Sequence, residues 1–237
     1  MKLHLAEEIA KFGAYTPMSR ARLHASKLVK NSAKACAFEL YKPEKMKNPN
    51  IMALIRGNGF ASQVLAACTY KEVCGEFDGI VFSVDAIHKP DNAVIECKYC
   101  GNASSCSEIP DDLFGKALAQ LLFYTALYNK SKTTKQYKGK TCPKLKTPIS
   151  LLIVGLRNSV EVWGFKFTAT ELSIALKFYK AKVATILDAE YGNWDEVNEW
   201  DSRYVEGDWH AVLDKAGIDK EIKLKGSTLI ENQPIVF

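Results

Sequence analysis

The chain has 237 residues and a formal net charge of +5, with 47% hydrophobic and 25% charged residues. This composition is typical of a folded globular protein and excludes a disordered or fibrous chain. No run of about 18 apolar residues is present, and glutamates interrupt the N-terminal segment where a signal peptide needs an apolar core. The sequence therefore predicts a cytoplasmic, intracellular protein with no membrane partner.

Charge is distributed unevenly along the chain. Residues 129–147 hold seven lysines and no acid, whereas residues 188–209 hold eight acids and one basic residue, Arg203. A lysine-rich segment suits a polyanion, because neutralising phosphates releases condensed counterions. On this feature alone we favour a solvated loop that charge keeps in solution.

The N-terminal part is predicted to be helical. Apolar residues recur at helical spacing over 4–12 and 18–41, and the segment 42–50, which contains two prolines, interrupts the pattern. A further helix is predicted over 51–70, despite two glycines near its middle.

Strands are predicted next. Residues 75–84 and 93–99 are rich in β-branched and aromatic residues, and the turn-forming segment "DAIHKPDN" at 85–92 lies between them, which predicts a hairpin. The segment 111–129 has an acidic first turn and apolar residues at helical spacing, which predicts a helix.

A second pair of strands is predicted over 149–156 and 159–168, followed by a helix over 169–191 with Thr168 and Glu171 at capping-box spacing. The resulting fold class is α/β (α+β), with a central mixed β-sheet flanked by helices. We expect a single domain over 1–237, made of a helical part (1–70), a core (74–190) and an acidic C-terminal extension (191–237).

One charged pair interrupts the apolar strand "AVIECKY". Glu96 and Lys98 lie two positions apart and share one strand face, while Cys97 points to the other. If the first strand ends near residue 84, the hairpin register places Asp78 opposite residues 97–99, with Glu76 on the same face.

Buried carboxylates are costly unless something compensates their charge. Mg²⁺ does so in many proteins, because it accepts a few carboxylate oxygens and keeps waters or substrate phosphate as its other ligands. A neighbouring lysine can hold or deprotonate the water that attacks phosphorus.

These residues carry a resemblance to a known family. Asp78 in "FDG", followed by Glu96 and Lys98 in "ECK", resembles the D-x(n)-E-x-K core of the PD-(D/E)XK nuclease superfamily. "QLLFY" at 120–124 is similar to the Q-x-x-x-Y motif of its RecB-type exonuclease branch, on the helix that follows the hairpin. The resemblance implies a restriction-endonuclease-like core and a metal-dependent, exonuclease-like DNA nuclease.

The resemblance also implies roles for individual residues. Asp78, Glu96 and the Cys97 backbone carbonyl would bind Mg²⁺ or Mn²⁺, Lys98 would be the catalytic lysine, and Gln120 and Tyr124 would contact DNA or steady the catalytic groups. DNA is the implied partner, and a homo-oligomer or a protein partner stays open. Repair, recombination, defence and viral or phage replication all use this chemistry.

The sequence departs from the family pattern in two places. Phe77 stands where the family name has proline. The upstream helix of this branch often offers a glutamate or histidine, but residues 56–70 contain neither, which leaves Gln63 or Glu76 for the third metal ligand.

The same residues also fit ordinary structural roles. Glu96 and Lys98 could form an ion pair on a solvated strand face, and Gln120 and Tyr124 alone could be core residues. The alternative function is a catalytically silent nucleic-acid-binding or assembly subunit on the same scaffold. The lysine-rich segment fits both functions, with these candidate nucleic-acid-binding residues: Lys130, Lys132, Lys135, Lys138 and Lys140.

The chain has seven cysteines, an odd number at irregular spacing, which favours reduced thiols. Four of them raise the question of an iron–sulfur cluster or Zn²⁺: Cys97, Cys100, Cys106 and Cys142. We expect neither, because the C-x-x-C pair at 97–100 has no companion pair.

Overall fold

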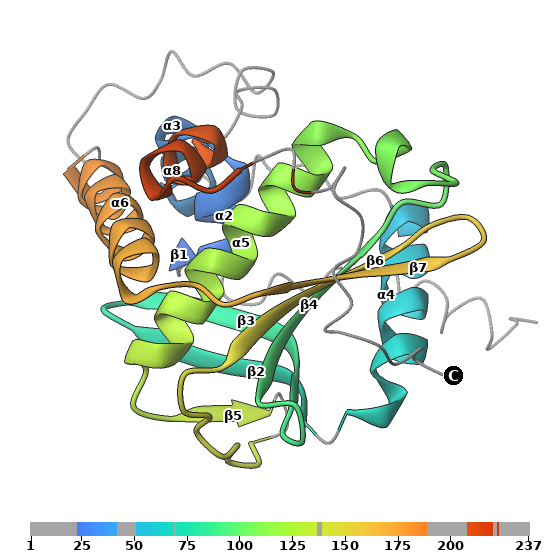
Figure 1. The fold of residues 1–237 in the computed structure, drawn as a ribbon. Coiled ribbons are helices and arrows are strands. Elements are labelled where there is room, and N and C mark those ends of the chain that lie inside the picture. Colours follow the sequence, from blue (N-terminus) through green and yellow to red (C-terminus); the bar gives the residue numbers. More distant parts are fainter. Residues whose placement is uncertain are drawn as a thin grey trace, which may run out of the picture.

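The computed structural model describes residues 23–41, 51–68, 70–136, 139–188, 208–219 and 222. These residues form a mixed seven-stranded sheet with helices on both of its faces (Figure 1). The predicted α/β class is confirmed. Across the described ranges no helix combines the length and apolar composition that a bilayer span requires.

The sheet has the strand order β5-β2-β3-β4-β6-β7, with β1 paired to β3. Its strands are β1 Leu23–His24, β2 Tyr70–Phe77, β3 Ile80–His88, β4 Ala93–Tyr99, β5 Thr134–Gln136, β6 Ile149–Gly155 and β7 Val160–Phe165. The helices are α2 Ala25–Lys30, α3 Ala33–Tyr41, α4 Ile51–Val64, α5 Asp111–Lys130, α6 Ala169–Asp188 and α8 Trp209–Ala216. Short 3₁₀ turns occupy Leu65–Ala67 and Cys106–Glu108.

The predicted hairpin is wrong in one respect that matters for function. The predicted strand over 75–84 is interrupted by a two-residue turn at Asp78 and Gly79, whose φ angles are +49° and +75°. Phe77 pairs directly with Ile80 across this turn. Asp-Gly favours such a hairpin because both central residues must adopt positive φ. Strand β3 then continues to His88, through residues for which the sequence predicts a turn.

Most later elements agree with the sequence. The predicted helix 111–129 is α5, the strands 149–156 and 159–168 are β6 and β7, and the helix after Thr168 is α6. The capping box is present, since Glu171 N–H donates to Thr168 Oγ1 at 3.2 Å and Thr168 N–H donates to Glu171 Oε2 at 2.6 Å.

The N-terminal helices differ more from the prediction. The helix predicted over 18–41 is two helices, α2 and α3. The helix predicted over 51–70 is α4, which ends at Val64 and is followed by a 3₁₀ turn. The sequence did not predict β1, β5 or α8. The helix predicted over 4–12 and most of the extension 191–237 lie outside the described residues.

Helix α5 is the centre of the larger core. Its residues from Phe114 to Tyr128 are buried except Lys116, and it packs between the sheet, α2, α6 and α8. Phe114 meets Trp163 of β7 edge to face, with ring centroids 5.1 Å apart. Helix α4 covers the other face, where a Cβ on Gly155 would lie only 2.4 Å from the Phe60 ring.

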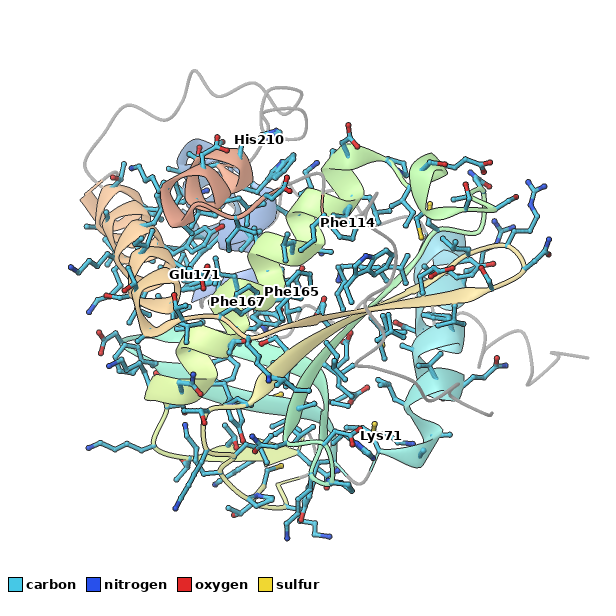
Figure 2. All side chains as sticks on the ribbon, viewed as in Figure 1. Lys71, Phe114, Phe165, Phe167, Glu171 and His210 are labelled. Atoms are coloured by element: carbon cyan, nitrogen blue, oxygen red, sulfur yellow. The ribbon has the colours of Figure 1, made fainter. Side chains whose placement is uncertain are left out.

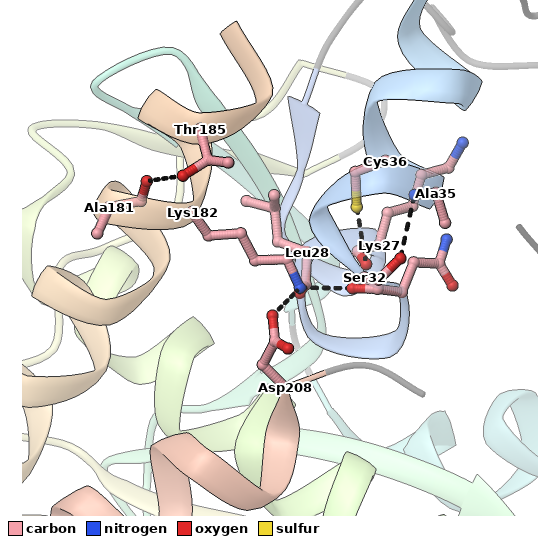
Figure 3. Close-up of polar contacts among 10 residues, drawn as sticks. Lys27, Leu28, Ser32, Ala35, Cys36, Ala181, Lys182, Thr185 and Asp208 are labelled. Carbon is pink, nitrogen blue, oxygen red and sulfur yellow. Dashed lines mark hydrogen bonds and ion pairs between the residues drawn. The ribbon is translucent and has the colours of Figure 1, made fainter. Parts of the chain in front are cut away.

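A buried lysine joins three helices above the sheet (Figure 3). Lys182 of α6 has a side chain only 4% exposed, and its ammonium donates to the carbonyl oxygens of Leu28 at 2.7 Å and Asn31 at 2.5 Å. Asp208, just before α8, accepts an ion pair from the same ammonium at 2.8 Å. The lysine therefore satisfies carbonyl groups at the C-terminal end of α2 that the helix itself leaves without donors.

Lys182→Met should lower the free energy of unfolding by about 1–3 kcal/mol, because it leaves buried carbonyl oxygens without donors. Urea denaturation followed by circular dichroism measures this difference. Lys177→Met is the matched control, since Lys177 lies on the same helix but is exposed. Equal losses in the two variants would contradict the role given to Lys182.

Candidate active site

The candidate site lies where β3 and β4 part. The two strands pair through Ala86 with Ile95, Ile87 with Val94 and His88 with Ala93, and their ladder ends there. Continued by one residue, this register brings Asp85 opposite Glu96. The ladder between β2 and β3 also omits Asp85 and its partner position Glu72, whose φ is +49°. Asp85 thus occupies an interruption of regular pairing on both sides of β3.

The Asp85 carboxylate bridges the fork between the strands. Its Oδ2 atom accepts a hydrogen bond from the backbone N–H of Cys97 at 2.6 Å. Burial raises the pKa of Asp85, and the Lys98 charge and the Cys97 N–H offset part of that rise. The carboxylate therefore takes the place of a backbone acceptor and is held beside Glu96.

Glu96 is the most buried acid of the site, with 2% of its side chain exposed. Its Oε1 atom accepts hydrogen bonds from Lys98 Nζ and from Gln120 Nε2, the latter at 2.7 Å. Among the described residues its Oε2 atom has no hydrogen-bond partner. Burial and then the Asp85 charge raise the pKa of Glu96 to about 7, against the opposing effect of Lys98.

The site also contains lysine ammonium groups. Burial lowers the pKa of Lys98, but the charges of Glu96 and Asp85 outweigh this effect, and the net pKa is raised. Lys98 is therefore a protonated donor in this arrangement. At the end of α2, burial and then the Lys98 charge lower the pKa of Lys30, while Glu96 and Asp85 oppose this.

Gln120 and Tyr124 lie on one face of α5, as the spacing predicts, and both are buried. Gln120 donates to Glu96, while the Tyr124 ring lies 6.4 Å from that of Phe82, centroid to centroid. Burial and then the charges of Glu96 and Asp85 raise the pKa of Tyr124, so its hydroxyl stays protonated. The helix thus brings one polar group to the site and buries an aromatic ring beside it.

Asp78 does not join this group, and the predicted register that placed it there is wrong. It occupies the β2–β3 turn, where its Oδ2 lies 2.5 Å from Lys180 Nζ and 46% of its side chain is exposed. At ~3.3 Å per residue, β3 separates Asp78 from Asp85 by roughly 20 Å. Asp85 is the residue that sequence reasoning missed, and the Asp-Gly turn signal at 78–79 could have found it by moving the hairpin turn.

The candidates for the third metal ligand lie elsewhere. Gln63 is exposed on α4, which covers the opposite face of the sheet from α5, and Glu76 is exposed on β2 opposite Val81. The Cys97 side chain is buried on the α4 face, as the strand alternation predicts, while its backbone stays beside Asp85.

All seven cysteines are free thiols. Cys97 belongs to the core under α4, whereas Cys100 and Cys142 belong to the core around α5, and Cys106 lies in a 3₁₀ turn. The sheet therefore separates Cys97 from the other members of the set that the sequence raised.

The lysine-rich segment forms the far edge of the sheet, where β5 pairs with β2. Its described candidates are exposed on the surface: Lys130, Lys132, Lys135 and Lys140. Lys138 lies outside the described residues. Two strands, β2 and β3, separate this edge from Glu96 on β4.

Carboxylate oxygens are the metal-binding groups that this site offers. In the described part of the chain, no three His, Cys, Asp or Glu side chains cluster as metal ligands. Asp85 and Glu96 provide two neighbouring carboxylates, and the buried Glu96 Oε2 lacks a partner there. These groups fit Mg²⁺ or Mn²⁺, because Mg²⁺ binds through one or two carboxylates and fills its other positions with water or phosphate.

No protein-family model and no curated protein sequence matches the chain. A solved structure titled "Crystal structure of SSO0001" superposes with a TM-score of 0.45 at 12% identity, over 89% of this chain and 92% of that one.

Glu96→Gln should alter the pH dependence of stability. Because the folded state raises the pKa of Glu96 from 4.5 to about 7, it binds the proton more tightly than the unfolded chain does. The free energy of unfolding therefore falls as pH rises through this window. Glu96→Gln lacks this titration. The difference in free energy of unfolding between the variant and wild type should therefore shift in favour of the variant from pH 5 to pH 8.

Thermal unfolding at pH 5 and pH 8 without divalent metal measures this difference, with Glu76→Gln on β2 as the exposed control. An advantage of Glu96→Gln that is equal at the two pH values would contradict the raised pKa.

Proposed function

We propose that the chain is a metal-dependent phosphodiesterase that acts on nucleic acid. More specifically, we propose a DNA nuclease of the PD-(D/E)XK type, in the RecB-like branch, with exonuclease-like activity. The observation that carries the proposal is the Glu96 carboxylate, which is buried beside Asp85 with one oxygen unpartnered among the described residues.

The residues divide the work as follows. Asp85 and Glu96 would hold Mg²⁺ or Mn²⁺, and the Cys97 backbone carbonyl stays a candidate ligand. The ion would supply Lewis-acid stabilisation of phosphate charge and a more acidic bound water. Lys98 remains protonated and can donate to a phosphate oxygen or to the attacking water.

Gln120 fixes the direction of the Glu96 carboxylate through its 2.7 Å hydrogen bond. Tyr124 is buried beside it and excludes water from the back of the site. In this proposal Gln120 and Tyr124 position the acids, and Lys30 adds positive charge toward which a phosphate is attracted. The roles of the two motifs are therefore retained, with Asp85 in place of Asp78.

Mutation of the two aspartates should affect the cleavage rate to very different extents. Asp85→Asn should reduce Mg²⁺-dependent cleavage of DNA by roughly 10³-fold, because it removes several kcal/mol of charge stabilisation. Asp78→Asn should leave the rate within about twofold, because that carboxylate pairs with Lys180 far from Glu96.

A cleavage assay on linear, circular, single- and double-stranded DNA, with and without Mg²⁺, measures these rates and distinguishes end-dependent from internal cutting. Wild-type protein that binds DNA without cutting it under any condition would favour the catalytically silent binding subunit. Loss of cleavage in Asp78→Asn alone would contradict the assignment of Asp85.

Mg²⁺ should stabilise the folded wild-type protein. An ion that binds only the folded state adds about 2.7 kcal/mol at a concentration 100 times its dissociation constant. Differential scanning fluorimetry over a Mg²⁺ series should therefore show a rising Tm for wild type and for Asp78→Asn, and a much smaller rise for Asp85→Asn. Equal rises in all three proteins would place the ion elsewhere.

A further inference from the structure

A second feature of the molecule is a cavity between α5 and α6. Its volume is about 730 Å³, and it is lined by the C-terminal end of α5, the start of β6, the link after β7 and α6 from Ala169 to Lys180. Every lining residue belongs to the described ranges. A cavity of this size is large enough for one small organic ligand or for one unit of a polymer.

The charge of the lining has one sign. Four lysines reach it from α5, from the link after β7 and from α6: Lys130, Lys166, Lys177 and Lys180. None of the described residues that line the cavity is acidic. Asp78 lies outside it and pairs with Lys180, so three of the four ammonium groups face the cavity without that carboxylate. A ligand with phosphate groups complements this arrangement.

The floor of the cavity is apolar and contains an aromatic ring. Phe167, two residues after the end of β7, stacks on Phe165 with ring centroids 5.5 Å apart and planes inclined by 5° (Figure 2). Phe167 lines the cavity, whereas Phe165 is buried behind it. Leu176 of α6 adds to the same apolar surface. Phe167 thus forms the outer ring of a two-ring stack, which is suited to receive a planar base.

We propose that this cavity binds a nucleotide of single-stranded nucleic acid, with its base against Phe167 and its phosphates at Lys130, Lys166 and Lys177. The choice of nucleic acid rests on the proposed function, because other anions with a flat apolar part have the same chemistry. The cavity and the candidate site are both built on α5, where Gln120 and Lys130 lie about 15 Å apart along the helix axis. The cavity is therefore a second contact on the substrate and not part of the hydrolytic centre.

Binding of a fluorescein-labelled 12-nucleotide oligo(dT) tests this proposal. The measurement is fluorescence anisotropy with EDTA, on the full chain carrying Asp85→Asn, so that neither metal nor cleavage contributes. Lys166→Glu/Lys177→Glu should weaken binding at least tenfold and reduce the slope of log K against log salt by about 1.4. Phe167→Leu, which keeps an apolar side chain, should weaken binding about tenfold with an unchanged slope.

Lys89→Glu is the matched charge control for Lys166→Glu alone, since each variant reverses one charge and Lys89 is exposed in the β3–β4 turn. Each of three results would overturn the proposal. The first is a loss of affinity in Lys89→Glu equal to that in Lys166→Glu, and the second is unchanged affinity in a Phe167→Leu variant whose circular dichroism is native. The third is competition by polyglutamate as strong as that by unlabelled oligo(dT). The predicted binding pattern in a wild-type chain that never cleaves DNA would support the cavity and remove the proposed function. A chain that cleaves DNA without this binding pattern would support the proposed function and overturn the cavity proposal.

Discussion

The structure depends on a glutamate carboxylate that is buried at the point where two strands part. A charged group in this position is costly, and the cost falls only when nearby groups donate to it or carry the opposite charge. Lys98 and Gln120 both reach one oxygen of Glu96, and Asp85 is held close by a backbone N–H. A second carboxylate so near makes the ionised state less favourable still. The arrangement stores charge repulsion that a cation would relieve.

The fold accounts for the meeting of these groups. Strands β4 and β6 are parallel, so the chain must cross over between them, and α5 is that crossover. The helix crosses the face of β4 that carries Glu96 and Lys98, and its burial from Phe114 to Tyr128 fixes Gln120 against the carboxylate. On the other face, α4 covers Cys97 and keeps that side of β4 apolar. The same α5 extends to Lys130, where a cavity with lysines on its wall begins.

Sequence reasoning was sound where one local signal decided the structure. The period of α5, the capping box of α6 and the apolar runs of β6 and β7 each predicted an element that the structure contains. Glu96 and Lys98 on one face, and Gln120 on the next helix, also followed from spacing alone. The alternative of a solvated strand face is wrong for Glu96, which is almost entirely buried.

The failure at Asp78 had a local cause with a long-range consequence. A run of β-branched and aromatic residues reads as one strand, although Asp-Gly in its middle is a strong hairpin turn signal. Because strand register fixes every opposing pair, one misplaced turn assigned the wrong aspartate. Elements that depend on tertiary packing, such as β1 and β5, had no comparable signal, since two or three residues of a strand form only against a partner.

Direct location of the ion tests the central claim most sharply. Crystals grown with Mn²⁺ and measured by anomalous diffraction should show one strong peak within bonding distance of the Asp85 and Glu96 carboxylates and close to Lys98. A peak at Asp78, or well-occupied Mn²⁺ only at sites remote from Glu96, would contradict it.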